Sequence, residues 1–150
     1  MATQKERDIA APFRPRRLGH VNYFVSDLDR TMDFYKKVGG FEEVYRKAAG
    51  TAPDSPVVAG FLSNGNTHHD VAVVIRGSKP GLNHFGFELE NETDLVAGFR
   101  ATSAGVTLRA SDHRIARSLY CFDPDGNGTE IYADITPEWR KVRGDGRIVR

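Results

Sequence analysis

Hydrophobic and polar residues follow strand-like and helix-like patterns in a definite order along the first half of the chain. Residues 18–25 contain several aromatic and β-branched side chains and predict a strand. Residues 28–38 carry apolar side chains at spacings of four, three and three, which predicts an amphipathic helix. Three more strands are expected at 41–47, 57–62 and 69–75. This half therefore predicts a βαβββ unit.

The second half repeats this order after a short link at residues 77–80, which contains glycine and proline. A strand is expected at 81–89 and a helix at 92–103. A further strand at 106–110 and a hairpin over 118–132 complete the second half. The chain thus predicts a second βαβββ unit.

Two pairs of equivalent residues support an internal duplication. His20 and His84 lie in the first strand of each predicted unit, 64 residues apart. Asp27 and Asn91, the expected helix N-caps, have the same separation. Two βαβββ units of this kind can pair their curved sheets into a half-barrel cleft, and small-molecule sites usually lie in such concave places. We therefore expect an α+β fold of two paired modules.

The folded part is expected to form one domain over residues 17–135, with module one at 17–76 and module two at 81–135. Residues 1–16 are interpreted as a flexible N-terminal arm, because prolines discourage regular structure there. Residues 136–150 are interpreted as a C-terminal tail.

The hairpin near the C-terminal end contains a candidate site. Its centre, Asp123-Pro124-Asp125-Gly126, suits a type I turn because each residue type is favoured at its position. In the favourable register, Tyr120 and Glu130 project from the same face of neighbouring strands. A phenol and a carboxylate would then lie side by side on the inner face of the sheet.

Charge and cysteine content narrow the range of partners and compartments. The formal net charge is +1, and although basic residues gather near both ends, we expect no nucleic-acid partner. Cys121 is the only cysteine, so an internal disulfide is excluded and a reducing cytoplasm is the expected compartment. No segment has the pattern of a secretory signal or of a membrane span. We expect a cytoplasmic protein without a membrane partner.

The duplication suggests that His20 and His84 could bind one metal ion together. If the two units pair about a pseudo-twofold axis, His20 and His84 face each other, and Glu130 on the last strand can join them. Two histidines and one carboxylate on one face of an ion leave other positions open, as in non-haem Fe(II) oxygenases. Nitrogen and oxygen ligands also suit Mn(II). A metal site of these three residues is therefore expected.

At this point the chain resembles a known family, the vicinal oxygen chelate superfamily, which includes glyoxalase I, fosfomycin and bleomycin resistance proteins and the type I extradiol dioxygenases. The resemblance covers about residues 17–135 and rests on Gly19-His20-Val21, Leu82-Asn83-His84-Phe85 and Phe122-Asp123-Pro124-Asp125-Gly126-Asn127 with Glu130. It implies the paired βαβββ fold and a metal ion bound by His20, His84 and Glu130.

Further features resemble the extradiol branch of that superfamily. His69 lies fifteen residues before His84, the spacing at which extradiol enzymes have their catalytic acid/base. Tyr120 lies ten residues before Glu130, where that branch has a tyrosine that hydrogen-bonds the bound catecholate. His113 resembles another active-site histidine of the branch. The resemblance thus implies catalytic roles for His69, Tyr120 and His113.

The function implied is that of an Fe(II)-dependent extradiol dioxygenase, which cleaves a catechol-like aromatic diol with O2, as in the catabolism of aromatic hydrocarbons. Extradiol dioxygenases of the commoner size have four modules, whereas two are predicted here. A homodimer or higher homo-oligomer is therefore expected to supply the remaining wall of the substrate pocket.

Two alternatives stay open. A glyoxalase-like metal-dependent isomerase or epimerase generally uses a fourth, acidic ligand from the end of the first unit, where residues 71–75 are apolar. A metal-free small-molecule binding protein of the drug-resistance type is the other alternative, and the presence of all three ligand positions counts against it.

Overall fold

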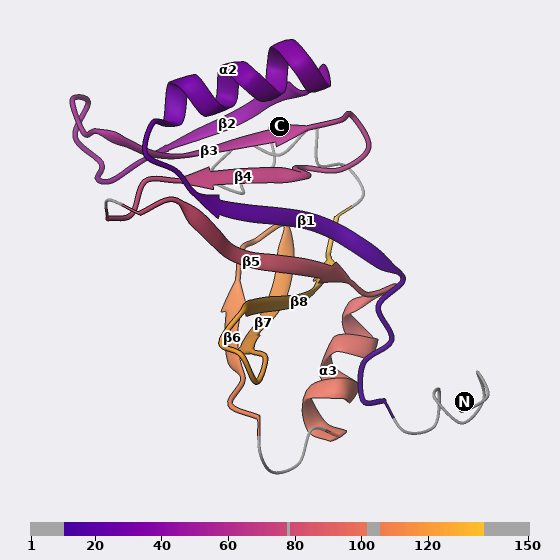
Figure 1. The fold of residues 1–150 in the computed structure, drawn as a ribbon. Coiled ribbons are helices and arrows are strands. Elements are labelled where there is room, and N and C mark those ends of the chain that lie inside the picture. The colour runs from indigo at the N-terminus through magenta and orange to yellow at the C-terminus, as the bar shows by residue number, and fades with distance from the viewer. Residues whose placement is uncertain (1–10, 78, 102–105, 137–150) are drawn as a thin grey trace. The chain divides into compact units, whose positions relative to one another are not determined.

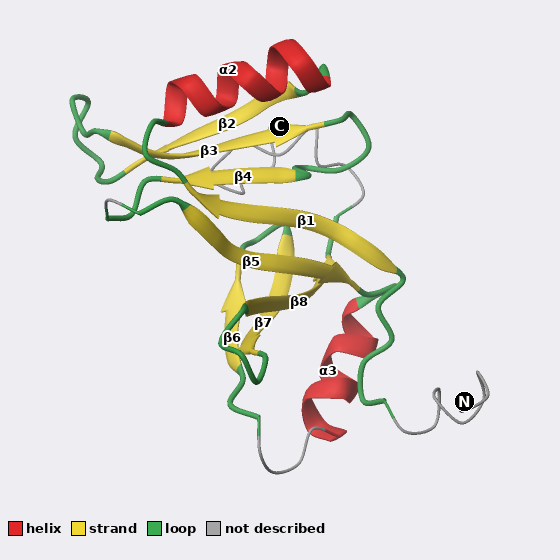
Figure 2. Ribbon diagram, in the orientation of Figure 1, coloured by secondary structure: helices red, strands yellow, loops and turns green. Residues whose placement is uncertain are grey.

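The computed structural model describes residues 11–77, 79–101 and 106–136 (Figure 1). In chain order the elements are β1 (Arg17–Phe24), α2 (Leu28–Gly39), β2 (Glu42–Ala48), β3 (Val57–Ser63), β4 (Val71–Val74), β5 (Gly81–Glu88), α3 (Glu92–Ala101), β6 (Arg109–Asp112), β7 (Ala116–Phe122) and β8 (Gly128–Asp134). Figure 2 shows the loops between them. Within the described residues, neither helix combines the length and apolar character needed to cross a membrane.

The described chain divides into two compact units, which do not coincide with the sequence repeats. The N-terminal unit comprises residues 19–85, from β1 through β4 to the start of β5. The C-terminal unit comprises residues 86–136 together with 11–18. The repeated order of strand, helix and three strands is as the sequence predicts. The predicted fold class of two βαβββ modules is therefore confirmed.

Four strands of the N-terminal unit follow the order β2-β3-β4-β1. The pairs β2–β3 and β3–β4 are antiparallel, whereas β1 and β4 run parallel with Val21 opposite Val71. At the start of this pairing, the Val21 amide donates a hydrogen bond to the carbonyl of Asp70, the residue before β4, at 2.9 Å. The loop that enters β4 is therefore held beside His20.

Helix α2 begins at the predicted residue, Leu28, and ends at Gly39, one residue beyond the predicted end. The Asp27 carboxylate accepts a hydrogen bond from the Arg30 amide at 3.0 Å, as an N-cap does. Gly40 ends the helix with a φ of 69°, a left-handed conformation that glycine adopts without a steric penalty. The predicted apolar stripe is buried only in part, because Val38 in the last turn is 71% exposed.

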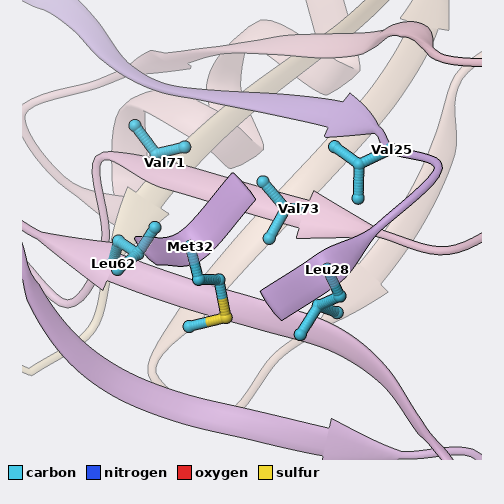
Figure 3. Packing of buried hydrophobic residues seen from close by; sticks show 6 residues of the cluster. All are labelled: Val25, Leu28, Met32, Leu62, Val71 and Val73. Atoms are coloured by element: carbon cyan, nitrogen blue, oxygen red, sulfur yellow. The ribbon is translucent and has the colours of Figure 1, made fainter. Parts of the chain in front are cut away.

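The core of the N-terminal unit lies between α2 and the strands β3 and β4 (Figure 3). Met32 is fully buried there and contacts the strand at Gly60, where a Cβ atom would lie only 2.2 Å from the Met32 sulfur. Val21 and Tyr23 of β1 pack against the same core. Because side chains alternate across a strand, His20 and Asn22 face away from α2.

The C-terminal unit repeats this construction with the strand order β8-β7-β6, and α3 packs on β7 and β8. Asn91 caps α3 by accepting from the Asp94 amide at 2.9 Å. One cluster of buried apolar side chains in this unit comprises Leu89, Leu95, Leu119 and Ala133. Val96 and Phe99 of the same helix are partly exposed, at 40% and 49%.

Strand β6 differs from its predicted position at residues 106–110. It covers Arg109–Asp112, so it begins and ends later than predicted. The reason is the turn that follows, in which the His113 amide donates to the Ala116 carbonyl at 2.9 Å and Arg114 has a φ of 68°. Antiparallel pairing from this turn brings Asp112 opposite Arg117.

The hairpin between β7 and β8 has the predicted turn. The Gly126 amide donates to the Asp123 carbonyl at 3.0 Å, the bond that closes a β-turn. The Asp123 carboxylate accepts from the Asn127 side-chain amide at 2.7 Å, and this bond contributes most to lowering the pKa of Asp123. Tyr120 pairs directly with Glu130 across the strands, which confirms the predicted register.

The residues just before β1 pack on the C-terminal unit. The Phe13 ring lies over α3 at Gly98, where a Cβ atom would come within 2.3 Å of it. The Arg16 amide donates to the Glu88 carbonyl at 2.8 Å. Residues 11–16, part of the segment interpreted as an arm, are thus joined to the folded part, while residues 1–10 and 137–150 lie outside the described ranges.

The Glu88 carboxylate is 1% exposed and is surrounded by polar partners. Arg16 Nε donates to it at 3.0 Å, Arg17 Nε at 2.7 Å and the Tyr132 hydroxyl at 3.3 Å. Two guanidinium groups therefore compensate the buried negative charge, as a carboxylate in such a place requires.

Candidate active site

His20 and His84 are brought together by neighbouring strands of the N-terminal unit. Their Nε2 atoms lie 3.3 Å apart, with the two rings nearly perpendicular. His20 is only 5% exposed, and His84 is half-buried. The two histidines that the sequence predicts to face each other are thus adjacent in this unit.

The spacing of the two imidazoles suits ligands of one ion. For metal–nitrogen bonds of about 2.1 Å at right angles, two ligand nitrogens lie about 3 Å apart. The observed 3.3 Å between Nε2 of His20 and Nε2 of His84 is close to this separation. Neutral imidazole nitrogens are common ligands of divalent first-row metals. The donor set on this strand pair therefore fits such a metal.

His69 lies beside this pair, although not on a strand as the sequence predicts. The predicted strand at 69–75 is shorter in the structure, where β4 begins at Val71. Because β4 runs parallel to β1, the residues entering β4 pass next to His20. The His69 and His20 ring centroids are 4.6 Å apart, and the Phe61 ring packs edge-on to His69 at 5.2 Å.

His68 is a neighbour of this cluster that the sequence reasoning missed. Its Nδ1 lies 3.0 Å from Nδ1 of His69. Its side chain is buried, and burial lowers the pKa of His68 to about 4. The sequence signal for this contact is the His68-His69 pair itself, but sequence alone does not say which of two adjacent residues faces inward.

Tyr120 and Glu130 form the corresponding pair in the C-terminal unit. Leu119 and Ile131 of the same strands belong to the core under α3, so alternation turns Tyr120 and Glu130 to the opposite face. Glu130 is only 4% exposed. Burial and the negative charge of Glu130 raise the pKa of Tyr120, so the phenol keeps its proton.

His113 contacts the Tyr120 hydroxyl. Its Nε2 lies 2.9 Å from the hydroxyl oxygen, close enough for a hydrogen bond in either direction. His113 itself is exposed in the turn between β6 and β7. The structure thus brings His113, Tyr120 and Glu130 together within the C-terminal unit.

Arg109 is a second residue that the sequence reasoning missed. It lies directly opposite Tyr120 on β6, and its guanidinium carbon is 4.7 Å from the centre of the Tyr120 ring. This distance is typical of a cation–π interaction. The contact depends on which residues of β6 pair with β7, and the predicted strand at 106–110 did not specify this pairing.

Cys121 takes no part in either cluster. Its side chain is half-buried, and burial raises the pKa of the thiol. A thiol in that state is a weak nucleophile.

Comparisons with known proteins agree with this geometry. The model of the Glyoxalase/Bleomycin resistance protein/Dioxygenase superfamily matches residues 17–131. A catechol-2,3-dioxygenase of Bacillus subtilis is 32% identical over 121 residues, which cover 78% of this chain and 41% of that protein. A lactoylglutathione lyase of Arabidopsis thaliana is 33% identical over 138 residues, which cover 82% of this chain and 46% of that protein.

A solved structure shares both fold and sequence. The crystal structure of the 2,3-dioxygenase LapB from Pseudomonas sp. KL28 has a TM-score of 0.65 and 27% identity, covering 79% of this chain and 42% of that one. The chain therefore spans less than half the length of the relatives that it matches. The family match extends over most of the described residues, and the chain belongs to the Glyoxalase/Bleomycin resistance protein/Dioxygenase superfamily.

Proposed function

We propose that this protein is an extradiol-type dioxygenase, which cleaves the ring of a catechol-like aromatic diol next to its paired hydroxyls and inserts both atoms of O2. The observation that carries the proposal is the position of His69 beside His20, which itself pairs with His84. A base next to a possible metal site is what proton transfer from a metal-bound diol requires. The similarity to two 2,3-dioxygenases supports the same reaction class.

The proposed metal ligands are His20, His84 and Glu130. Each offers one atom of a kind that binds divalent metals, an imidazole nitrogen or a carboxylate oxygen. Fe(II), or alternatively Mn(II), in this donor set would leave positions for the substrate oxygens and O2 and would lower the pKa of the bound hydroxyls. The burial of His20 and Glu130 supports a role other than that of solvated surface groups.

His69 is the proposed acid/base. It takes a proton from a catechol hydroxyl as the diol binds and returns that proton to the ring-opened product. An imidazole suits this exchange because its unperturbed pKa is about 6.5. The contacts with His20 and Phe61 on two sides support a fixed orientation of the His69 ring.

Tyr120 is proposed to orient the substrate. Because its pKa is raised, the phenol keeps its proton at neutral pH and can donate a hydrogen bond to a substrate oxygen. His113, in contact with the Tyr120 hydroxyl, supports this orientation. In this proposal His113 acts through Tyr120.

The proposal is tested by anaerobic purification, metal analysis and an assay with Fe(II), O2 and a panel of catechols. We expect uptake of O2 and a yellow ring-opened product, both abolished in Glu130→Gln. The matched control is Glu90→Gln, because the Glu90 carboxylate is largely exposed and lies outside the proposed donor set. Bound metal without O2 uptake by the native protein would contradict the dioxygenase reaction.

A second candidate is a glyoxalase-like isomerase, favoured by the 33% identity with a plant lactoylglutathione lyase. An acidic fourth ligand at the end of the first module is typical of that reaction, whereas β4 (Val71–Val74) has only apolar side chains. The same purified protein, assayed for lactoylglutathione formation, distinguishes the two reactions. Activity there without ring cleavage would favour the isomerase.

We further propose that the protein acts in the cytoplasm as a homodimer or higher homo-oligomer, in which another copy supplies part of the substrate pocket. The proposal rests on the small number of modules in the described chain. Light scattering coupled to gel filtration measures the mass directly, and a monomer that cleaves catechols at full rate would contradict it.

A further inference from the structure

His68 and His69 contact each other through the Nδ1 atoms of their rings. Nδ1 of His68 lies 3.0 Å from Nδ1 of His69, with the rings nearly perpendicular. His68 is 8% exposed, and its ring lies 6.3 Å from that of Phe61. The buried His68 ring is therefore in direct contact with the partly buried His69 ring in the N-terminal unit.

The loop that carries both histidines is fixed by its own hydrogen bonds. The Ser63 hydroxyl donates to the Thr67 carbonyl at 2.5 Å, immediately before His68. The Asn64 amide donates to the Asp70 carboxylate at 2.7 Å, immediately after His69. The backbone is thus tied on both sides of the pair, which limits the positions that the two rings can adopt.

A hydrogen bond between two Nδ1 atoms needs one donor and one acceptor. A neutral imidazole carries a proton on one nitrogen and a lone pair on the other. Burial keeps His68 neutral at pH 7, because its pKa is lowered to about 4. His68 can therefore accept at Nδ1 in both forms of His69, neutral or doubly protonated, without becoming charged itself.

We propose that His68 is a positioning residue that accepts a hydrogen bond from Nδ1–H of His69, so that Nε2 of His69 carries the lone pair that takes the substrate proton. The inference rests on the acid/base role proposed for His69. A base whose second nitrogen is held by another group has a defined tautomer and a defined ring orientation. His20 and Phe61 limit the same ring on its other sides.

The tautomer is measured by nitrogen NMR of the ¹⁵N-labelled full chain, with and without Zn(II) as a diamagnetic ion. His69→Gln assigns the signals. In the native protein we expect neutral His69 to carry its proton on Nδ1. His68→Phe, which keeps a ring but removes the acceptor, is expected to move the proton toward Nε2. His68→Asn, which retains a polar group near the place of Nδ1, is expected to preserve the native tautomer.

Kinetics provide the second readout. His68→Phe is expected to lower kcat for catechol cleavage by about 10-fold to 100-fold, as loss of an orienting partner typically does, with KM nearly unchanged. His68→Asn is expected to recover most of that loss. A His69 proton on Nε2 in the native protein would overturn the inference, as would a His68→Phe protein with native tautomer and kcat.

The two proposals fail in distinguishable ways. A native protein that cleaves no catechol contradicts the dioxygenase proposal, while the NMR comparison still decides whether His68 sets the tautomer of His69. If His68→Phe does not fold, the native spectrum and the His68→Asn spectrum carry the test.

Discussion

Nε2 of His20 and Nε2 of His84 lie 3.3 Å apart, although 64 residues separate them in the chain. Their proximity follows from the pairing of β1 with β5, the first strands of the two repeats. Two proposed ligand nitrogens that backbone pairing places in this way need little rearrangement to bind an ion. Metal binding should therefore stabilise the folded protein measurably.

The first prediction concerns this stabilisation. Mn(II) at 100 times its dissociation constant is expected to stabilise the fold by about 2.7 kcal/mol, because the ion binds only the folded state. Thermal unfolding followed by circular dichroism, with EDTA to reverse the shift, measures it. His20→Ala should lose the shift, whereas His113→Ala, outside the proposed donor set, should keep it. Equal loss in both variants would argue against these ligands.

The second prediction concerns the phenol of Tyr120. Its pKa is raised by burial first and by the charge of Glu130 next, so Glu130→Gln should lower it. Absorbance near 295 nm during a pH titration reports the ionisation, and Tyr120→Phe identifies the signal. Because the folded pKa lies above the unfolded value of about 10, the contribution of Tyr120 to stability is lost as pH rises past that value. A Tyr120 titration that is unchanged in Glu130→Gln would show that the two groups do not interact.

The third prediction concerns acid stability. The pKa of His68 is about 4 in the folded protein and about 6.5 when unfolded, so the unfolded chain binds the proton more readily. Stability contributed by neutral His68 is therefore present above pH 6.5 and lost as pH falls toward 4, by about 3 kcal/mol in total. Urea unfolding at several pH values measures this slope.

His68→Asn should flatten the slope between pH 6.5 and 4, because the titrating group is gone. The matched control is His113→Asn, since His113 is exposed and should leave the slope nearly unchanged. The same slope in the native protein and in His68→Asn would mean that another group is responsible.

The fourth prediction concerns the contact between Met32 and Gly60. A methyl group at Gly60 would meet the Met32 sulfur at 2.2 Å, so Gly60→Ala should destabilise the fold by about 1–3 kcal/mol. Gly81→Ala is the matched control, because its Cβ would meet no atom within 4 Å. Urea unfolding of both variants measures the difference. Equal stability of the two variants would show that the Met32 side chain moves aside at no cost.

Much of the fold was predictable from sequence because the helix-capping and turn residues agreed with the pattern of hydrophobic positions. The Asp27 cap and the Asp123–Gly126 turn each depend on a few adjacent residues and were confirmed. The register of Tyr120 with Glu130 followed from that turn, because a tight turn fixes which residues face each other.

The features that sequence missed depend on tertiary pairing. Strand β6 is defined by its antiparallel pairing with β7 and not by its own polar residues, so the contact of Arg109 with Tyr120 was not predicted. The loop position of His69 depends on where β4 begins its parallel pairing with β1. The partnership of His68 with His69 was missed for the same reason, since burial decides which ring faces the interior.

The packing of Phe13 on Gly98 and of Arg16 on Glu88 has a consequence for chain assembly. These residues precede β1, yet their partners follow the whole N-terminal unit in the chain. Cutting the gene at the repeat boundary would therefore not yield two autonomous halves. A fragment that begins at residue 81 would lack both arginines that neutralise Glu88, and a buried carboxylate without its partner costs about 3–5 kcal/mol.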